Sequence, residues 1–138
     1  LFPASRGSGT FLNDRRVRVS GRTRYHEALL GAHWPNSGDL EQGSARFRSM
    51  AEGSTGVRRL GATVLDLAYV ACGRLDGFCG VGLKPWDLAA GSLMVLEAGG
   101  LVSDFDGEQE WMDTGNVLAA SPKIFTQMLA TLNPPSAA

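Results

Sequence analysis

The chain has 138 residues, of which 43% are hydrophobic, so it is long enough for one domain with a buried core. Thirteen basic and fourteen acidic residues leave a formal net charge of -1, which gives no support to a nucleic-acid or membrane partner. No stretch reaches the roughly 20 apolar residues that cross a bilayer, so we expect a soluble protein. Cys72 and Cys79 are not spaced like metal ligands or like a disulfide framework, so we expect free thiols in the cytoplasm.

Apolar runs separated by Gly, Pro and Asn-Asp predict alternating strands and helices. In chain order, the expected elements are a hairpin or pair of short strands over 1–20, a strand over 28–34, a weakly amphipathic helix over 38–52, a short strand over 57–60, a helix over 62–75, a buried strand over 77–81, a helix over 86–98, and then strands over 101–105 and 117–120 and a helix over 122–132. This order indicates a layered α/β domain, and the hairpin argues against a purely parallel sheet.

The helix over 62–75 is apolar nearly all round, so we expect it to be buried on every side, with Gly73 capping its C-terminus. Asp66 lies inside this helix. Because a lone buried charge is costly, we expect Asp66 to form an internal ion pair with Arg58 or Arg59.

Other local signals mark helix ends and turns. Gly99-Gly100 is expected to stop the helix over 86–98, and Ser121-Pro122 to begin the last helix as N-cap and first helical residue. Asp104 and Asp106 predict a turn, and residues 134–138 a frayed tail.

The most informative motif is Pro85-Trp86-Asp87, followed after an apolar stretch by Glu97-Ala98-Gly99-Gly100. Since proline cannot occupy a helix interior, Asp87 falls in the first helical turn, where the helix dipole favours a negative charge. The same carboxylate at an element end could hold a cation, although magnesium usually needs more than one carboxylate. The local sequence leaves both roles of Asp87 open, helix cap and metal ligand.

The remaining polar residues favour structural roles. Glu97 near a helix C-terminus opposes the dipole, a mild conflict that a specific partner would resolve. His26 and His33 have no Cys or His at ligand spacing and belong to no nucleophile motif, so we expect them to be satisfied or exposed. No glycine-rich phosphate loop is present.

Taken together, Leu83–Gly91 and Glu97–Gly100 resemble the second signature of the inositol monophosphatase family. Further similarity to the C-terminal half of bacterial members covers Arg6-Gly7, Gly9, Asn13, Arg16–Ser20, Arg58–Leu67, Asp76-Gly77, Asp104–Gly107 and Asn116–Ser121. The resemblance implies a mixed β-sheet with flanking helices, the C-terminal half of an αβαβα sandwich. Residues 1–20 would end the sheet of a missing N-terminal half, 21–133 would form the C-terminal α/β domain, and 134–138 the tail.

The resemblance implies Mg²⁺-dependent hydrolysis of a small phosphate monoester, foremost inositol 1-phosphate, by a homodimer. Asp87 matches a metal ligand that also lies near a substrate hydroxyl. Gly61, Ala62 and Thr63 match the stretch that lines the sugar side of the substrate. Gly80 stands near the alcohol portion, where members that use inositol phosphate commonly carry Glu, so the substrate identity stays open.

The Gly-Glu-Glu and Asp-Pro-x-Asp-Gly-Thr motifs of the family's first half are missing from these residues. The implied partner is therefore an N-terminal half of the same protein, without which the chain is expected to be inactive. One alternative is a related sugar-bisphosphate or nucleotide 3'-phosphatase. Another is a non-catalytic protein that dimerises or binds partners, since some bacterial relatives are linked to RNA-processing or transcription machinery and Arg58-Arg59 could lie on an association surface.

Overall fold

A computed structural model describes residues 4–33 and 48–133 of the chain. Its elements are β1 (Ala4–Ser5), β2 (Gly9–Leu12), β3 (Arg15–Val17), the 3-10 turn η1 (Tyr25–Glu27), β4 (Leu29–His33), β5 (Gly56–Arg58), α2 (Thr63–Ala71), β6 (Gly77–Gly80), α3 (Pro85–Glu97), β7 (Leu101–Ser103), α4 (Trp111–Thr114), β8 (Val117–Ala120) and α5 (Pro122–Leu132). Residues 48–53 are also helical. The tail over 134–138 and most of the helix expected over 38–52 lie outside the described residues.

The described elements form two sheets. Strands β1, β2 and β3 make a small antiparallel sheet, and the larger sheet has the order β5-β4-β6-β8-β7. In the larger sheet β4 runs parallel to β5 and β6, whereas β8 is antiparallel to both β6 and β7. The expected layered α/β domain with a mixed sheet is confirmed. The hairpin segment forms a separate sheet, so the change from parallel to antiparallel pairing in the larger sheet occurs between β6 and β8.

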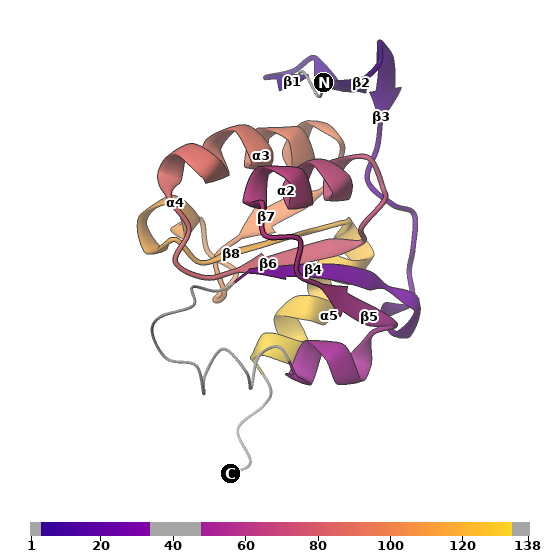
Figure 1. The fold of residues 1–138 in the computed structure, drawn as a ribbon, viewed down its shortest axis with the longest axis vertical. Helices are drawn as coiled ribbons and strands as arrows, with labels where there is room; N and C mark the ends of the chain where they lie inside the picture. The colour runs from indigo at the N-terminus through magenta and orange to yellow at the C-terminus, as the bar shows by residue number, and fades with distance from the viewer. Residues whose placement is uncertain (1–3, 34–47, 134–138) are drawn as a thin grey trace.

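Helices separate and cover these sheets (Figure 1). Helices α2 and α3 lie between the small sheet and the five-stranded sheet, and α5 with residues 48–53 covers the opposite face of the larger sheet. Each face therefore has its own core, with Phe78 and Leu67 on the α2/α3 side and Leu30, Leu118 and Met128 on the α5 side. Burying a side chain of this size stabilises the fold by about 1.5 to 3 kcal/mol.

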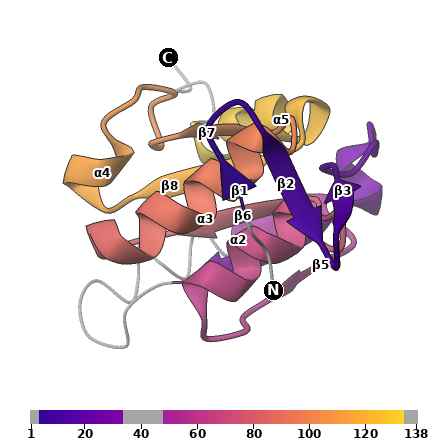
Figure 2. The ribbon, with the colours of Figure 1, turned by 90° about the horizontal axis from the view of Figure 1, so that it is seen from above.

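The small sheet lies over α3 (Figure 2) and is held there by polar contacts. The buried hydroxyl of Thr10 in β2 donates a hydrogen bond to the carbonyl oxygen of Met94 at 2.7 Å. After β3, the backbone N–H of Val19 donates to the carbonyl oxygen of Ala98 at 3.0 Å. These contacts fix the first segment of the chain against the C-terminal half of α3.

Asp76, the residue just before β6, fastens the linker from β3 to the larger sheet. Its buried carboxylate accepts hydrogen bonds from the backbone N–H of Leu29 at 2.8 Å, from Arg22 Nε at 3.1 Å and from the hydroxyl of Ser20. Since all three donors come from residues before or at the start of β4, this carboxylate joins segments more than 40 positions apart in the sequence.

The glycines expected to end helices do so in the left-handed conformation. Gly73 has φ +81° and its N–H donates to the carbonyl of Val70, while the next residue donates to that of Tyr69. Gly99 has φ +93°, and Gly100 donates to the carbonyl of Val95 at 2.9 Å. Both ends show the paired backbone bonds of a Schellman motif, which confirms these expectations.

One expectation about the helices is wrong, and another is confirmed. Helix α2 is not buried on every side, because Val64 and Leu65 are 41% and 39% exposed on a face that no described residue covers. Ser121 is the N-cap residue of α5 and Pro122 is its first residue, as expected, although the Ser121 side chain makes no cap hydrogen bond and its buried hydroxyl has no partner among the described residues. The backbone N–H of Ser121 instead donates to the carbonyl of Asp76.

The turn expected from Asp104 and Asp106 is confirmed. Asp104 Oδ1 accepts hydrogen bonds from the backbone N–H groups of Asp106 at 2.9 Å and Glu108 at 2.8 Å. Gly107 follows with φ +81°, a conformation that glycine adopts without steric cost.

Candidate functional site

A polar pocket of about 420 Å³ opens where α2 and α3 begin. It is lined by His33, Gly61, Ala62, Thr63, Val64, Gly82, Leu83, Lys84 and Asp87. Four of the five residues assigned from the family resemblance therefore meet in one pocket, although the two segments that carry them are more than 20 positions apart. The fifth, Gly80, does not line this pocket.

The pocket receives the N-termini of two helices. Pro85 is the first residue of α3, which leaves Asp87 in the first turn, as expected from the sequence. Neither Ala62, the N-cap residue of α2, nor Lys84, that of α3, makes a side-chain cap hydrogen bond. Helix N-termini without side-chain caps carry partial positive charge on their free N–H groups, so this pocket favours an anion such as a phosphate group.

Gly80 is buried directly beneath the pocket wall. A Cβ atom at this position would lie 2.5 Å from Leu83 Cδ1 and 2.8 Å from Phe78 Cε2. Because Leu83 itself lines the pocket, it fills the space that a larger side chain at position 80 would need. The packing of Leu83 and Phe78 therefore leaves no space for a carboxylate side chain at position 80.

His33 enters the pocket from the end of β4, a placement that the sequence did not predict. Its Nδ1 atom is buried and has no hydrogen-bond partner among residues 4–33 and 48–133. Burial lowers the pKa of the imidazole, the nearby Arg59 charge lowers it further, and Asp87 opposes both effects. The ring is therefore neutral at pH 7. The sequence offers one signal that could have drawn attention to His33, which is its position at the carboxyl end of a strand that pairs in parallel.

Among the described residues that line the polar pocket, Asp87 carries the one carboxylate. Within residues 4–33 and 48–133, no group of three or more His, Cys, Asp and Glu side chains is arranged to hold a metal ion. Magnesium takes six oxygen ligands and is usually bound through one or two carboxylates together with substrate phosphate. The described pocket residues can therefore supply one carboxylate ligand, Asp87, to a magnesium ion whose other ligands come from elsewhere. They do not form a complete magnesium site by themselves.

The ion pair expected for Asp66 is not formed. Asp66 is fully buried, and neither carboxylate oxygen has a hydrogen-bond partner in the described part of the chain. It points toward the sheet at Gly31, where an added Cβ would lie 3.2 Å from Asp66 Oδ1. Burial raises the pKa of this carboxyl to about 6. The missing side chain at Gly31 makes room for the carboxyl group but provides no counter-charge.

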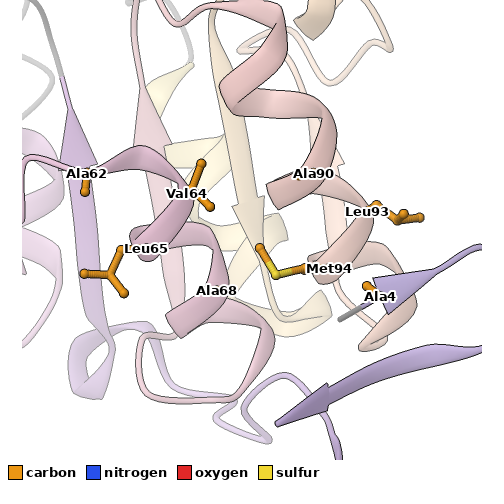
Figure 3. Close-up of a pocket in the computed structure, with 8 residues that line it drawn as sticks. All are labelled: Ala4, Ala62, Val64, Leu65, Ala68, Ala90, Leu93 and Met94. Atoms are coloured by element: carbon orange, nitrogen blue, oxygen red, sulfur yellow. The ribbon is translucent and has the colours of Figure 1, made fainter. Parts of the chain in front are cut away.

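A second hollow, the apolar groove, lies on the outer side of α2 and α3 (Figure 3). Its volume is about 530 Å³. The lining residues come from β1, α2 with the residue before it, and α3, and are Ala4, Ala62, Val64, Leu65, Ala68, Ala90, Leu93 and Met94. Exposed apolar surface of this kind commonly marks a contact with another protein segment.

Other features of the described chain concern its environment. None of its helices combines the length and apolar character that spanning a membrane requires. Neither Cys72 nor Cys79 forms a disulfide bond within the part of the chain that the structure describes.

Comparison with known proteins connects this geometry to one group. The model of the inositol monophosphatase family matches residues 1–135. The Nus factor SuhB of Pseudomonas aeruginosa is 49% identical over 137 residues, which cover 96% of this chain and 51% of that protein. The inositol-1-monophosphatase of Mesorhizobium japonicum is 44% identical over 140 residues, covering 100% of this chain and 53% of that protein.

Solved structures agree with the sequence comparisons. The crystal structure of the extragenic suppressor protein suhB from Bartonella henselae matches with a TM-score of 0.94 and 40% identity, covering 97% of this chain and 52% of that one. The chain thus spans about half the length of the relatives that it matches.

Proposed function

The chain belongs to the inositol monophosphatase family and corresponds to the C-terminal half of its members, and from this we propose that it forms part of a magnesium-dependent phosphatase acting on a small phosphate monoester, foremost inositol 1-phosphate. The observation that carries the proposal is the polar pocket, which joins Asp87 to the N-termini of α2 and α3. Cytoplasmic location and a homodimer are further proposals that rest on the family alone.

Each side of the pocket has a proposed task. Asp87 supplies one carboxylate ligand to magnesium, and bound magnesium would neutralise the phosphate and activate a water molecule for in-line attack. Gly61, Ala62 and the buried Thr63 bind the alcohol portion of the substrate, where the uncapped N-terminus of α2 attracts oxygen atoms. Gly80 acts from beneath the pocket wall by keeping the space for Leu83.

The other ligands are proposed to come from an N-terminal half of the same protein. Two features support this partner: the apolar groove, which no described residue covers, and the small sheet of β1 to β3, in which β1 and β3 pair with β2 but have no strand on their outer edges among the described residues. Residues 1–20 would extend the sheet of that half, and 21–133 would form the second domain. Without the partner we expect the chain to be inactive.

The test is the substitution Asp87→Asn in the full-length protein encoded with this chain. We expect loss of phosphate release from inositol 1-phosphate on the order of a hundredfold or more, since several kcal/mol of charge stabilisation depend on the metal. Activity is measured against magnesium concentration. Asp113→Asn is the matched control, because Asp113 is an exposed first-turn aspartate of α4 that does not line the pocket. If Asp87→Asn leaves activity and its dependence on magnesium unchanged, Asp87 is not a magnesium ligand.

A related phosphatase activity is the nearest competing proposal. The absence of a carboxylate at Gly80 supports a sugar bisphosphate or a nucleotide 3'-phosphate as substrate. A panel of phosphate monoesters offered to the full-length protein separates these from inositol 1-phosphate, through the ratio of kcat/KM values.

A second candidate function is a non-catalytic interaction role. The observation that favours it is the 49% identity to a protein named Nus factor SuhB. Under this proposal, Asp87→Asn restores growth or transcription phenotypes of a strain lacking the gene as well as the wild type does, whether or not the wild-type protein releases phosphate. Failure of the variant to restore them would support the phosphatase role.

A further inference from the structure

The position of His33 in β4 determines from which face of the five-stranded sheet its side chain projects. His33 and Gly80 are Cα partners in the parallel pair of β4 and β6. Side chains two residues apart on a strand share a face, and a Cβ at Gly31 would point at Asp66 of α2. His33 therefore projects from the face covered by α2 and α3, next to the position where Gly80 has no side chain.

The surroundings of His33 determine which ring nitrogen can meet a ligand. Burial and the charge of Arg59 lower the pKa of the imidazole and Asp87 opposes them, so the ring is neutral at pH 7. Nδ1 is buried and has no hydrogen-bond partner among the described residues, whereas Nε2 is not one of the buried atoms that lack a partner. Nε2 is therefore the nitrogen that can face the polar pocket, and a ring protonated there offers an N–H donor.

We propose that His33 is a specificity-determining residue of this pocket, whose Nε2–H donates a hydrogen bond to a hydroxyl oxygen on the alcohol portion of the phosphate monoester. This inference rests on the proposed phosphatase function and names the contact that selects its substrate. Leu83 closes the space above Gly80, so the neighbouring strand supplies the polar group instead. A neutral donor in this place selects for hydroxyl-bearing alcohols without adding charge to the pocket.

The test compares two esters and three substitutions in the full-length protein with magnesium. Inositol 1-phosphate carries ring hydroxyls, whereas p-nitrophenyl phosphate carries none. We expect His33→Ala to raise KM for inositol 1-phosphate roughly threefold to tenfold, the effect of one neutral hydrogen bond, with kcat unchanged. Kinetic constants for p-nitrophenyl phosphate stay the same. His33→Gln, whose amide reaches the place of Nε2, restores KM, whereas the shorter His33→Asn does not.

The control is His26→Ala, because the side chain of His26 is 71% exposed and does not line the pocket. An active enzyme in which His33→Ala leaves both esters unchanged, or weakens both equally, overturns the inference and leaves the proposed function standing. A wild-type protein that releases no phosphate from either ester overturns the proposed function and this inference with it. Thermal unfolding of each variant verifies that the three substitutions are compared in folded protein.

Discussion

Glu97 Oε1 accepts a hydrogen bond from the backbone N–H of Gly9 at 2.9 Å, which joins the last turn of α3 to the first residue of β2, at the end of the loop that follows β1. The backbone N–H groups of Gly9 and Gly7 hold the pKa of this carboxyl below its ordinary value. The loop therefore provides the compensation that a carboxylate at a helix C-terminus needs, and the conflict noted in the sequence is resolved by a contact 88 positions away.

Glu97→Gln is expected to loosen the small sheet while leaving the larger sheet intact. The neutral amide accepts a weaker hydrogen bond than the carboxylate, so the amide proton of Gly9 should exchange faster with solvent, and those of Val117–Ala120 should keep their rates. Hydrogen exchange monitored by NMR measures both. The matched control is Glu110→Gln, an exposed glutamate before α4. Equal exchange at Gly9 in both variants contradicts the expectation.

The same carboxylate predicts a pH dependence. Since the pKa of Glu97 is lower in the folded state, its stabilising contact is complete above the unfolded value of 4.5 and is lost as pH falls through the folded pKa. In wild-type protein, exchange at Gly9 should therefore accelerate below about pH 4.5 relative to the intrinsic rate. The variant Glu97→Gln should lack this relative acceleration.

Asp66 predicts a pH dependence of opposite sign. Its pKa rises from 3.8 to about 6 on folding, so its protonated form stabilises the fold below pH 3.8, and this contribution is lost as pH rises through about 6. The loss amounts to about 3 kcal/mol in the free energy of unfolding. Urea unfolding from pH 4 to pH 7 measures the trend, and Asp66→Asn should remove it. An identical pH profile in the two proteins would contradict the buried, unpaired state of Asp66.

The packing over Gly80 gives a prediction on stability. Gly80→Ala should lower the free energy of unfolding by about 1 to 3 kcal/mol, because its Cβ meets Leu83 and Phe78 inside van der Waals distance. In the background Leu83→Ala the same substitution should cost less, a non-additivity measured by urea unfolding in a double-mutant cycle. Gly21→Ala is the control, since a Cβ there meets nothing within 4 Å. Additive losses would refute the steric explanation.

The apolar groove predicts how the two halves assemble. Leu65→Glu places a charge in the groove, and it should abolish assembly with the N-terminal half and the phosphate release that depends on it. Leu101→Glu is matched in chemistry and exposure, 41% against 39% for Leu65, but lies on β7 outside the groove. Titration of the separately expressed N-terminal half onto each variant measures the difference. Equal binding by both variants rules out the groove as the docking surface.

Much of the fold follows from short-range signals in the sequence. Gly73 and Gly99 end helices because the left-handed conformation favours glycine, a preference that depends on a few neighbouring bonds. The strand expected over 117–120 matches β8, since turn residues border it on both sides. Helix α4 was not predicted, because one turn of helix is too short for an apolar period.

The candidate site depended more on the family resemblance than on local chemistry. Asp87 was placed correctly in a first helical turn, yet its meeting with Thr63 depends on how α2 and α3 pack. His33 carried no spacing signal, because its neighbours in the pocket are distant in sequence. The unpaired state of Asp66 was equally unpredictable, since only tertiary structure decides whether an arginine reaches a buried carboxylate.

The position of β8 has a consequence for synthesis on the ribosome. Among the described residues it is the last strand in chain order, yet it lies between β6 and β7 and pairs with both. A nascent chain that ends before Val117 leaves those two strands without the neighbour that joins them, and their apolar edges stay open to other chains. The backbone N–H of Leu83, in the pocket wall, donates a hydrogen bond to the carbonyl of Gly115. This bond can form only after Gly115, which precedes β8, has been synthesised. Translation must therefore pass α4 before the wall of the pocket can form completely.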